Sequence, residues 1–141
     1  MSGRFLIDTN VLISLLFKTV DKNTDALIGD YSNQVYISSV AVMEFINLLQ
    51  FERIALSKKK HFDVRNVFDF VENTLGIAIK YIDKGHLRTL TQLPTFPTHK
   101  DPNDRLMIAQ AIAEGLTMIS SDTKFHYYVD FGLDFIKAKH E

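Results

Sequence analysis

Four carboxylates stand at positions from which they could act together on a metal ion. Asp8 follows the apolar run RFLI, Asp122 follows LTMISS, and Glu44 lies within SSVAVMEFINLL. Asp104 lies three residues after Asp101 in HKDPNDR. Carboxylates that gather in one place repel, and one or more stays protonated unless a cation lies between them. Such hard oxygen ligands suit Mg²⁺ or Mn²⁺, and the chemistry implied is phosphate-ester hydrolysis by a metal-activated water.

Each acid also has a structural explanation, which the sequence leaves open. Asp8 and Asp122 could cap the helical segments that follow them, because aspartate is a good N-cap residue. Asp104 could form an imperfect capping box with Asp101, where the helix dipole favours acids. Glu44 could lie on an exposed side of its helix. A cap residue followed by proline marks a helix start, so we interpret Asp101 as the cap and Asp104 as the ligand.

The acids must be positioned by strands and helices that alternate along the chain. Apolar runs predict five buried strands, over residues 4–8, 35–38, 77–82, 116–121 and 133–137. Helical stripes lie between them, formed by Val11, Leu12, Leu15 and Leu16, by Val42, Phe45, Ile46 and Leu49, by Val64, Val67, Phe68 and Val71, and by Leu106, Ala109, Ile112 and Ala113. This alternation predicts a parallel sheet covered on both faces, with ligands bound beyond the carboxyl ends of the strands. If the first and fourth strands are neighbours, the four acids share one cleft.

Composition bounds the class of protein. The chain has 141 residues, of which 46% are hydrophobic and 23% charged, and we expect a single domain over residues 1–141. It has no cysteine, which excludes disulfides and cysteine-based zinc sites or nucleophiles. The N-terminal apolar run contains Asp8 and Asn10, so we expect no signal peptide. No apolar stretch reaches the roughly 18 residues of a membrane span, and we expect a cytoplasmic protein.

The formal net charge of −1 argues against a generally basic nucleic-acid binder. It does not exclude a nuclease, because a local basic stripe can follow phosphates while acids elsewhere hold cations. For the run of three lysines, a solvated turn is the favoured interpretation. The candidate basic residues are Arg53, Lys58, Lys59, Lys60, Lys100 and Arg105.

The motifs together resemble the PIN-domain nucleases, and most closely the VapC-type toxins of bacterial toxin–antitoxin pairs. The resemblance runs from Arg4 to about Ile136 and rests on FLIDTNVLI, on a helix with an embedded glutamate, and on HKDPNDRLMIAQAIAEGLTMISSDTKF. It implies an α/β fold, a three-layer α/β/α sandwich around a parallel sheet of about five strands. It also implies an Mg²⁺- or Mn²⁺-dependent endoribonuclease, a cognate antitoxin partner and a homodimer.

By this resemblance the acids match the family's metal-binding positions. Asp8 and Asp104 would be the firmest ligands, and Glu44 and Asp122 would complete the cluster. Polar residues that orient the first acid and the attacking water are matched by Thr9, Asn10 and Ser121.

Other residues near these motifs are expected to be structural. Arg105 matches the arginine after the third acid, and an ion pair with a neighbouring carboxylate is favoured over a catalytic role. His99 is expected to be structural too, although a histidine near the site could contact substrate. The chain departs from the family pattern at Asn103, where an apolar residue is common, and at Ser121, where threonine is common. Both departures leave substrate preference open.

The resemblance further implies how the protein acts and what controls it. Water would attack an RNA phosphodiester in line and leave a 5′-phosphate and a 3′-hydroxyl. The antitoxin would insert a residue into the acidic site, for which arginine is suited because its charge could replace that of the cation. The stripe of Phe45, Leu48, Leu49 and Phe51 is expected to be mainly core, with part available for a dimer contact.

Three alternatives remain at this point. A non-catalytic PIN fold that binds RNA or protein would be marked by loss of the acids, and all four are present. A receiver-like signalling domain would need a phosphate-accepting aspartate after a central strand, and only Asp83 follows the third strand. An aspartyl-phosphate phosphatase would need an aspartate two residues after Asp8, where the chain has Asn10.

Overall fold

The fold is built on one parallel sheet of five strands. The computed structural model describes residues 3–51 and 62–139. The strands are β1 (Arg4–Ile7), β2 (Gln34–Ser38), β3 (Ala78–Lys80), β4 (Thr117–Ser120) and β5 (Asp134–Lys137). They lie in the order β3-β2-β1-β4-β5, and every neighbouring pair is parallel. All five predicted strands are confirmed, and the first pairs with the fourth, which is the condition under which the four acids were expected to share one cleft.

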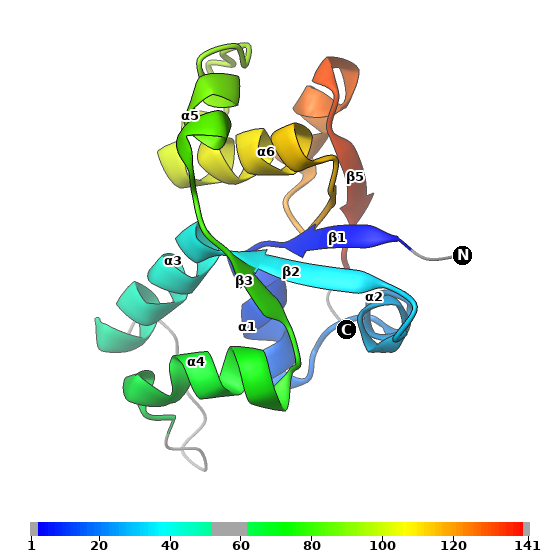
Figure 1. The fold of residues 1–141 in the computed structure, drawn as a ribbon, viewed down its shortest axis with the longest axis vertical. Coiled ribbons are helices and arrows are strands. Elements are labelled where there is room, and N and C mark those ends of the chain that lie inside the picture. Colours follow the sequence, from blue (N-terminus) through cyan, green and yellow to red (C-terminus); the bar gives the residue numbers. More distant parts are fainter. Residues whose placement is uncertain (1–2, 52–61, 140–141) are drawn as a thin grey trace.

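Helices cover both faces of this sheet and complete the predicted three-layer α/β/α sandwich. In Figure 1, α5 and α6 lie above the sheet, whereas α1 and α4 lie below it. The helices are α1 (Thr9–Phe17), α2 (Lys22–Gly29), α3 (Ser39–Gln50), α4 (Val67–Asp69), α5 (Lys84–Leu90) and α6 (Pro102–Glu114). Helical turns of other kinds are the 3-10 helices η1 (Val64–Asn66) and η3 (Thr123–Phe131) and the π-helix η2 (Phe70–Thr74). None of the helices in these described ranges is long and apolar enough to cross a membrane.

The core lies around the central strand. Leu6 and Ile7 of β1 have no exposed surface, because helices cover both faces to which successive side chains of a strand point. Ile37 of β2 and Met118 and Ile119 of β4 are equally buried beside them. The carboxyl end of β1 is therefore held rigidly by its two neighbours.

The burial of two helices can be compared with the predicted stripes. Of the four α6 residues predicted to face the core, Ala109 is buried but Ala113 is exposed. The buried residues of α6 are Met107, Ile108, Ala109, Gln110 and Ala111. Since α6 packs against α5 as well as the sheet, its buried surface is wider than one stripe and is rotated from the predicted one. In the stripe of α3 that was expected to be mainly core, Phe45 is buried, whereas Phe51, which directly follows the helix, is 71% exposed and belongs to the part left available for a contact.

The strand order sets where a ligand can bind. The chain moves from β1 outward through β2 to β3, then returns to add β4 and β5 on the other side of β1. The order therefore reverses between β1 and β4, and ligands of open α/β sheets bind at such a reversal. Receiver-like domains have a different order, 2-1-3-4-5, which excludes that alternative. Asp83 instead forms a capping box with His86 at the start of α5.

Candidate metal centre

The point of reversal between β1 and β4 carries two of the predicted acids. Asp8 directly follows β1, and its backbone N–H donates to the carbonyl of Ile119 on β4 at 3.3 Å. Asp122 follows β4 by two residues and caps η3 by accepting from the N–H of Lys124. The sheet thus brings these acids to the same edge although they are far apart in the sequence.

Asp8 uses its two carboxylate oxygens for different purposes. Oδ1 accepts from the backbone N–H of Val11 at 3.1 Å and caps α1, whereas Oδ2 accepts a short hydrogen bond from the hydroxyl of Ser120. Only 3% of the residue is exposed. Burial raises the pKa of Asp8 to about 6 despite both hydrogen bonds, and the charges of Asp122 and Glu44 also raise it. Both explanations of Asp8, helix cap and member of an acidic cluster, therefore hold.

Asp104 lies in the first turn of α6, beside the same edge. Asp101 caps this helix as predicted, accepting from the N–H groups of Asn103 and Asp104, so Asp104 is not needed as the cap. Burial raises the pKa of the Asp104 carboxyl to about 7, and the charges of Asp101, Glu44, Asp8 and Asp122 raise it further. This mutual repulsion means that Asp104 shares one electrostatic environment with the other three predicted acids.

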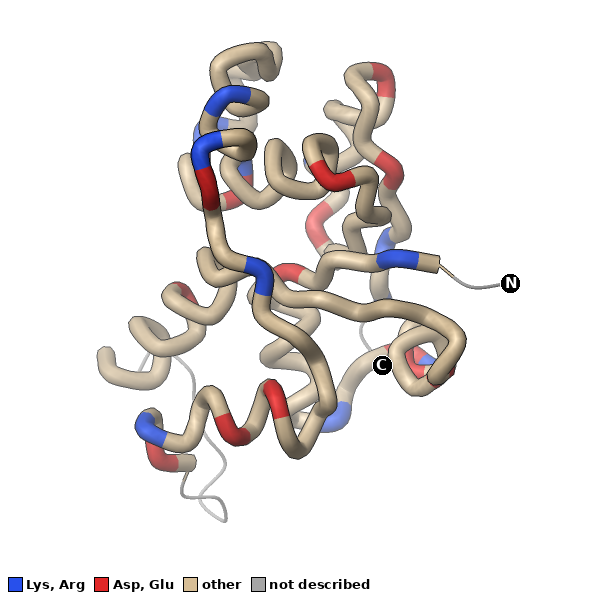
Figure 2. The backbone as a smooth tube through the Cα atoms, in the orientation of Figure 1, with Lys and Arg blue, Asp and Glu red and all other residues tan. Residues whose placement is uncertain are grey.

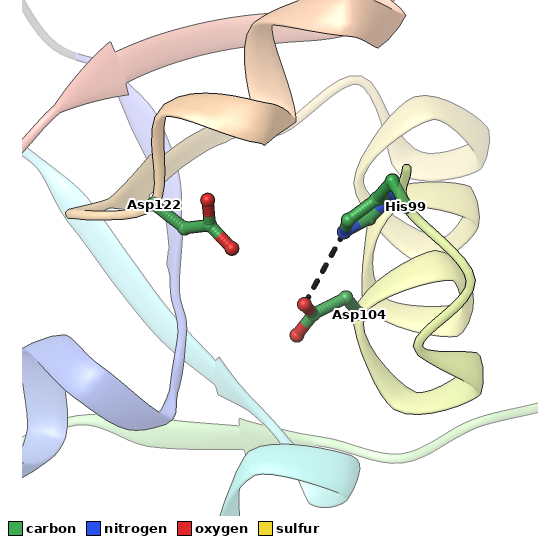
Figure 3. A group of neighbouring side chains, drawn as sticks. All are labelled: His99, Asp104 and Asp122. Atoms are coloured by element: carbon green, nitrogen blue, oxygen red, sulfur yellow. Dashed lines mark hydrogen bonds and ion pairs between the residues drawn. The ribbon is translucent and has the colours of Figure 1, made fainter. Parts of the chain in front are cut away.

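His99 joins this cluster, and sequence reasoning did not identify it as a ligand. Its Nε2 lies 3.3 Å from Oδ2 of Asp104, and Asp122 points toward the pair from the loop before η3 (Figure 3). One ligand atom from each of the three residues lies within 4.8 Å of the other two. The ring is 4% exposed, and burial lowers the pKa of His99, which favours the neutral imidazole that metals bind. The hydroxyl of Tyr128 lies 2.7 Å from Nδ1 and fixes the ring.

The remaining predicted polar residues separate into two groups. Thr9 is buried and donates from Oγ1 to Oε1 of Glu44 at 2.8 Å, which fixes that half-buried carboxylate. Asn10 is exposed, and within the described ranges no hydrogen bond is recorded for its side chain. The serine that contacts Asp8 is Ser120, which also accepts from the N–H of Asp122 at 3.0 Å; Ser121 is half-buried beside it.

Arg105 does not form the expected ion pair with any carboxylate among the described residues. Its Nη1 instead donates to the carbonyl of Pro94 at 2.8 Å and to the hydroxyl of Tyr128 at 3.3 Å. Arg105 therefore supports the loop that carries His99. Of the other predicted basic residues, Lys100 is exposed, whereas Arg53, Lys58, Lys59 and Lys60 lie outside the described residues.

The donors fit a hard divalent cation. Carboxylate oxygens and one neutral imidazole suit Mg²⁺ or Mn²⁺, and manganese accepts nitrogen ligands readily. Burial, with repulsion from the neighbouring acids, raises the pKa of Asp8 to about 6 and of Asp104 to about 7, and a cation among these groups would offset both effects. The arrangement can therefore bind a metal ion next to an open surface and act on a phosphate ester.

Comparison with known proteins supports this interpretation of the fold. A family model described as PIN domain matches residues 5–130. None of the curated protein sequences compared with the chain gave a significant match.

Several solved structures share the fold. The crystal structure of VapBC2 from Rickettsia felis, bound to a DNA fragment from their promoter, has a TM-score of 0.72 and 21% identity and covers 96% of this chain and 99% of that one. DNA-bound VapBC from Salmonella typhimurium has a TM-score of 0.69 and 18% identity, and the match covers 96% of this chain and 98% of that one. VapBC-5 from Mycobacterium tuberculosis, a member of the VapBC family of toxin-antitoxin systems, has a TM-score of 0.63 and 19% identity, over 96% and 98%.

Proposed function

The chain belongs to the PIN-domain family, and on that premise we propose that it is a metal-dependent endoribonuclease, the toxin of a VapC-type toxin–antitoxin pair. The observation that carries this proposal is the convergence of Asp8, Glu44, Asp104 and Asp122 from four separate segments. At the reversal point of the sheet, burial and then the charges of the neighbouring acids raise the pKa of Asp8 and of Asp104. Carboxylates in such a cluster are costly to ionise without a counter-ion. The best explanation for the cluster is therefore a cation that binds there and is required for function.

Mg²⁺ or Mn²⁺ would be held by His99, Asp104 and Asp122, whose ligand atoms lie within 4.8 Å of one another, and Asp8 and Glu44 would complete the acidic centre. When bound, such an ion lowers the pKa of water and neutralises charge that develops on a phosphodiester. The chain positions these carboxylates through hydroxyl groups: Ser120 donates to Oδ2 of Asp8, and Thr9 donates to Oε1 of Glu44. Water is the attacking group in this scheme, so the products carry a 5′-phosphate and a 3′-hydroxyl.

A protein partner belongs to the same proposal. The structures similar in fold were solved as VapBC complexes, and VapBC-5 is named as a toxin–antitoxin system. We expect an antitoxin to cover the acidic centre with an arginine, and both proteins to act in the cytoplasm, where cellular RNA is found. We also expect a homodimer. Met43 on α3 and Phe51 directly after it are 46% and 71% exposed and offer apolar surface for such a contact. Failure of the product of the adjacent gene to co-purify would count against the antitoxin.

The test is cleavage of RNA by the purified protein with Mn²⁺ or Mg²⁺. It is run beside a chelator control and an Asp8→Asn variant purified identically, because trace nucleases imitate weak activity. We expect cleavage that both controls abolish, with 5′-phosphate ends. Equal cleavage by the variant, or products with a cyclic 2′,3′-phosphate, would reject the mechanism. Metal binding without cleavage of any RNA would favour a narrow substrate, and neither binding nor cleavage would favour a non-catalytic PIN module.

A further inference from the structure

A cavity of about 490 Å³ lies beside the acidic centre and is not explained by metal binding. It is lined by Thr95, Phe96, Pro97, His99, Lys100 and Arg105. His99 belongs to both places, since its ring also contacts Asp104. The volume lies within the roughly 300–1,000 Å³ of small-molecule sites, where a mostly apolar lining is joined by a few placed polar groups.

We propose that this cavity binds the nucleotide next to the cleaved bond of a single-stranded RNA. The base would stack on Phe96, and the adjoining phosphate would lie against Lys100 and Arg105. The inference rests on the proposed nuclease function and deepens it, because it assigns a substrate subsite to residues outside the acidic cluster.

Phe96 is a prepared surface for stacking. Its ring is half-buried and packs against three other aromatic rings, with centroid distances of 5.3 Å to Tyr127, 5.1 Å to Tyr128 and 6.2 Å to Phe131. Phe131 is itself 52% exposed. Rings held in this way lose little freedom when a base stacks on them, and each base stacked on an aromatic side chain contributes about 1–3 kcal/mol.

The loop that carries Phe96 is also fixed before any ligand arrives. The N–H of His99 donates to the carbonyl of Phe96 at 3.0 Å, and Arg105 donates to the carbonyl of Pro94 at 2.8 Å. Because both hydrogen bonds close the loop onto α6 and the histidine, the cavity does not depend on a rearrangement. Both hydrogen bonds that the Arg105 side chain forms with described residues use Nη1, which leaves its other guanidinium N–H groups available for a phosphate.

Among the described residues, charge distinguishes this side of the acidic centre from the other. A second cavity, of about 290 Å³, is lined by Glu44, Asn47, Leu48, Phe51 and Asn103 and has no cation among these residues. Elsewhere basic and acidic positions are interspersed along the described backbone (Figure 2). An RNA phosphate next to the acidic centre would therefore be attracted to the side with Lys100 and Arg105, in agreement with the counter-charge that backbone binding requires.

The experiment measures binding of two fluorescein-labelled probes by anisotropy, in chelator and at low salt. One probe is a single-stranded RNA of mixed sequence, and the other is a base-free ribose-phosphate chain of equal length. The variants are Phe96→Leu and Lys100→Gln, with Lys22→Gln as the matched control, since Lys22 is also an exposed lysine and lies on α2. RNA cleavage with Mn²⁺ is followed in parallel for every variant.

We expect Phe96→Leu to weaken RNA binding by about 10-fold and to leave the base-free probe unaffected. Lys100→Gln should weaken the binding of both probes. It should also remove about one phosphate contact, which lowers the slope of log affinity against log salt concentration by about 0.7. Lys22→Gln should behave as wild type. Because Lys100 is exposed, its variant tests the inference even if Phe96→Leu fails to fold.

Two results would overturn the inference and leave the proposed function standing. The first is wild-type RNA affinity in both cavity variants together with normal metal-dependent cleavage. The second is unchanged RNA binding with weakened binding of the purified antitoxin, which would assign the cavity to the protein partner. If wild-type protein neither binds nor cleaves RNA, the proposed function and the subsite fail together.

Discussion

At the scale of single residues, Asp8 shows why helix-capping and metal-binding explanations do not compete here. One carboxylate oxygen satisfies the N–H of Val11 at the start of α1, and the other accepts from Ser120 toward the acidic centre. Capping orders the side chain before a metal arrives, since an N-cap oxygen has one preferred direction. The same helix start also brings the positive end of the dipole of α1 close to this carboxylate.

The raised pKa of Asp8 predicts how stability depends on pH in the metal-free protein. A carboxyl whose pKa is about 6 when folded and 3.8 ordinarily keeps its proton longer in the folded state. The folded state then binds more protons between pH about 4 and 6, so its stability falls as pH rises through this range. Asp8→Asn removes this loss and retains a capping side chain. In chelator, we expect the variant to gain about 1–3 kcal/mol over wild type above pH about 6, and nothing near pH 4.

Urea unfolding near pH 4 and above pH about 6, monitored by circular dichroism, measures the difference in unfolding free energy between variant and wild type. Excess Mn²⁺ should reverse the order above pH 6, because binding to the folded state stabilises the wild type. A variant that is less stable than wild type in chelator at pH 8 would show that the ionised Asp8 carboxylate does not destabilise the metal-free fold.

Two adjacent serines provide a sharper test of the site. Ser120→Ala removes the hydroxyl that donates to Asp8 and accepts from the N–H of Asp122, so it leaves a buried carboxylate and a half-buried N–H each short of a partner. We expect a loss of about 1–3 kcal/mol in stability and a reduced cleavage rate. Ser121→Ala is the matched control and should change both by much less. Equal effects of the two substitutions would mean that the contact with Asp8 has no special role.

Tyr128 should act on the metal site through His99. Tyr128→Phe removes the hydroxyl 2.7 Å from Nδ1 of the histidine while keeping the ring that packs against Phe96. Groups that orient a metal-binding histidine typically account for about 10–100-fold in metal affinity. We expect that loss in a Mn²⁺ titration, with a change in melting temperature of only a few degrees. Unchanged affinity would mean that His99 is not a ligand.

The sequence predicted the acids but not these neighbours, for physical reasons. Successive residues of an extended chain point to opposite sides, so only one of Ser120 and Ser121 can face Asp8. A shift of one residue in the strand exchanges them: the resemblance matches Ser121, whereas Ser120 contacts Asp8 in the structure. His99 lies in a loop, and its burial depends on Tyr128 and Phe125, which follow it by more than 20 residues. No local sequence pattern predicts such a contact.

At the scale of elements, the strands could be predicted because a strand buried on both faces is a continuous apolar run. Two helices were not predicted. α2 has the sequence KNTDALIG, with Thr24 its only buried residue, and α5 is the seven-residue KGHLRTL, with His86 its only buried residue. Neither has an apolar stripe: α5 packs against α6, and the two helices are capped by Asp21 and Asp83.

The end of α6 must be fixed for β4 to reach its place beside β1. Gly115 ends the helix in the left-handed region at φ 67°, and nothing lies within 4 Å of where a Cβ would stand. Gly115→Ala therefore meets only backbone strain, and we expect a loss of about 1 kcal/mol. Gly29→Ala, also in open space but without a positive φ, should be neutral or slightly stabilising. Thermal unfolding of both variants checks the difference, and an equal response would contradict it.

At the scale of the whole molecule, the reversal of strand order between β1 and β4 explains why the acids meet. Chain connections on either side diverge there and leave room for a ligand beyond the strand ends. The net charge of −1 is compatible with a nuclease because the basic residues Lys100 and Arg105 stand to one side of the acids. The parallel sheet with helices on both faces could be predicted from alternating strands and helices, whereas the strand order and the proposed side for substrate required the folded structure.

The most direct test of the central claim is calorimetric titration of metal-free protein with Mn²⁺ near pH 6.5, in buffers of different ionisation heat, beside Asp104→Asn. The pKa of Asp104 is raised to about 7 and that of Asp8 to about 6, so binding should release protons. We predict saturable binding with proton release in the wild type, and at least about 10-fold weaker binding with less release in the variant. No binding by the wild type, or equal affinity in the variant, would contradict the assignment of these acids to a metal centre.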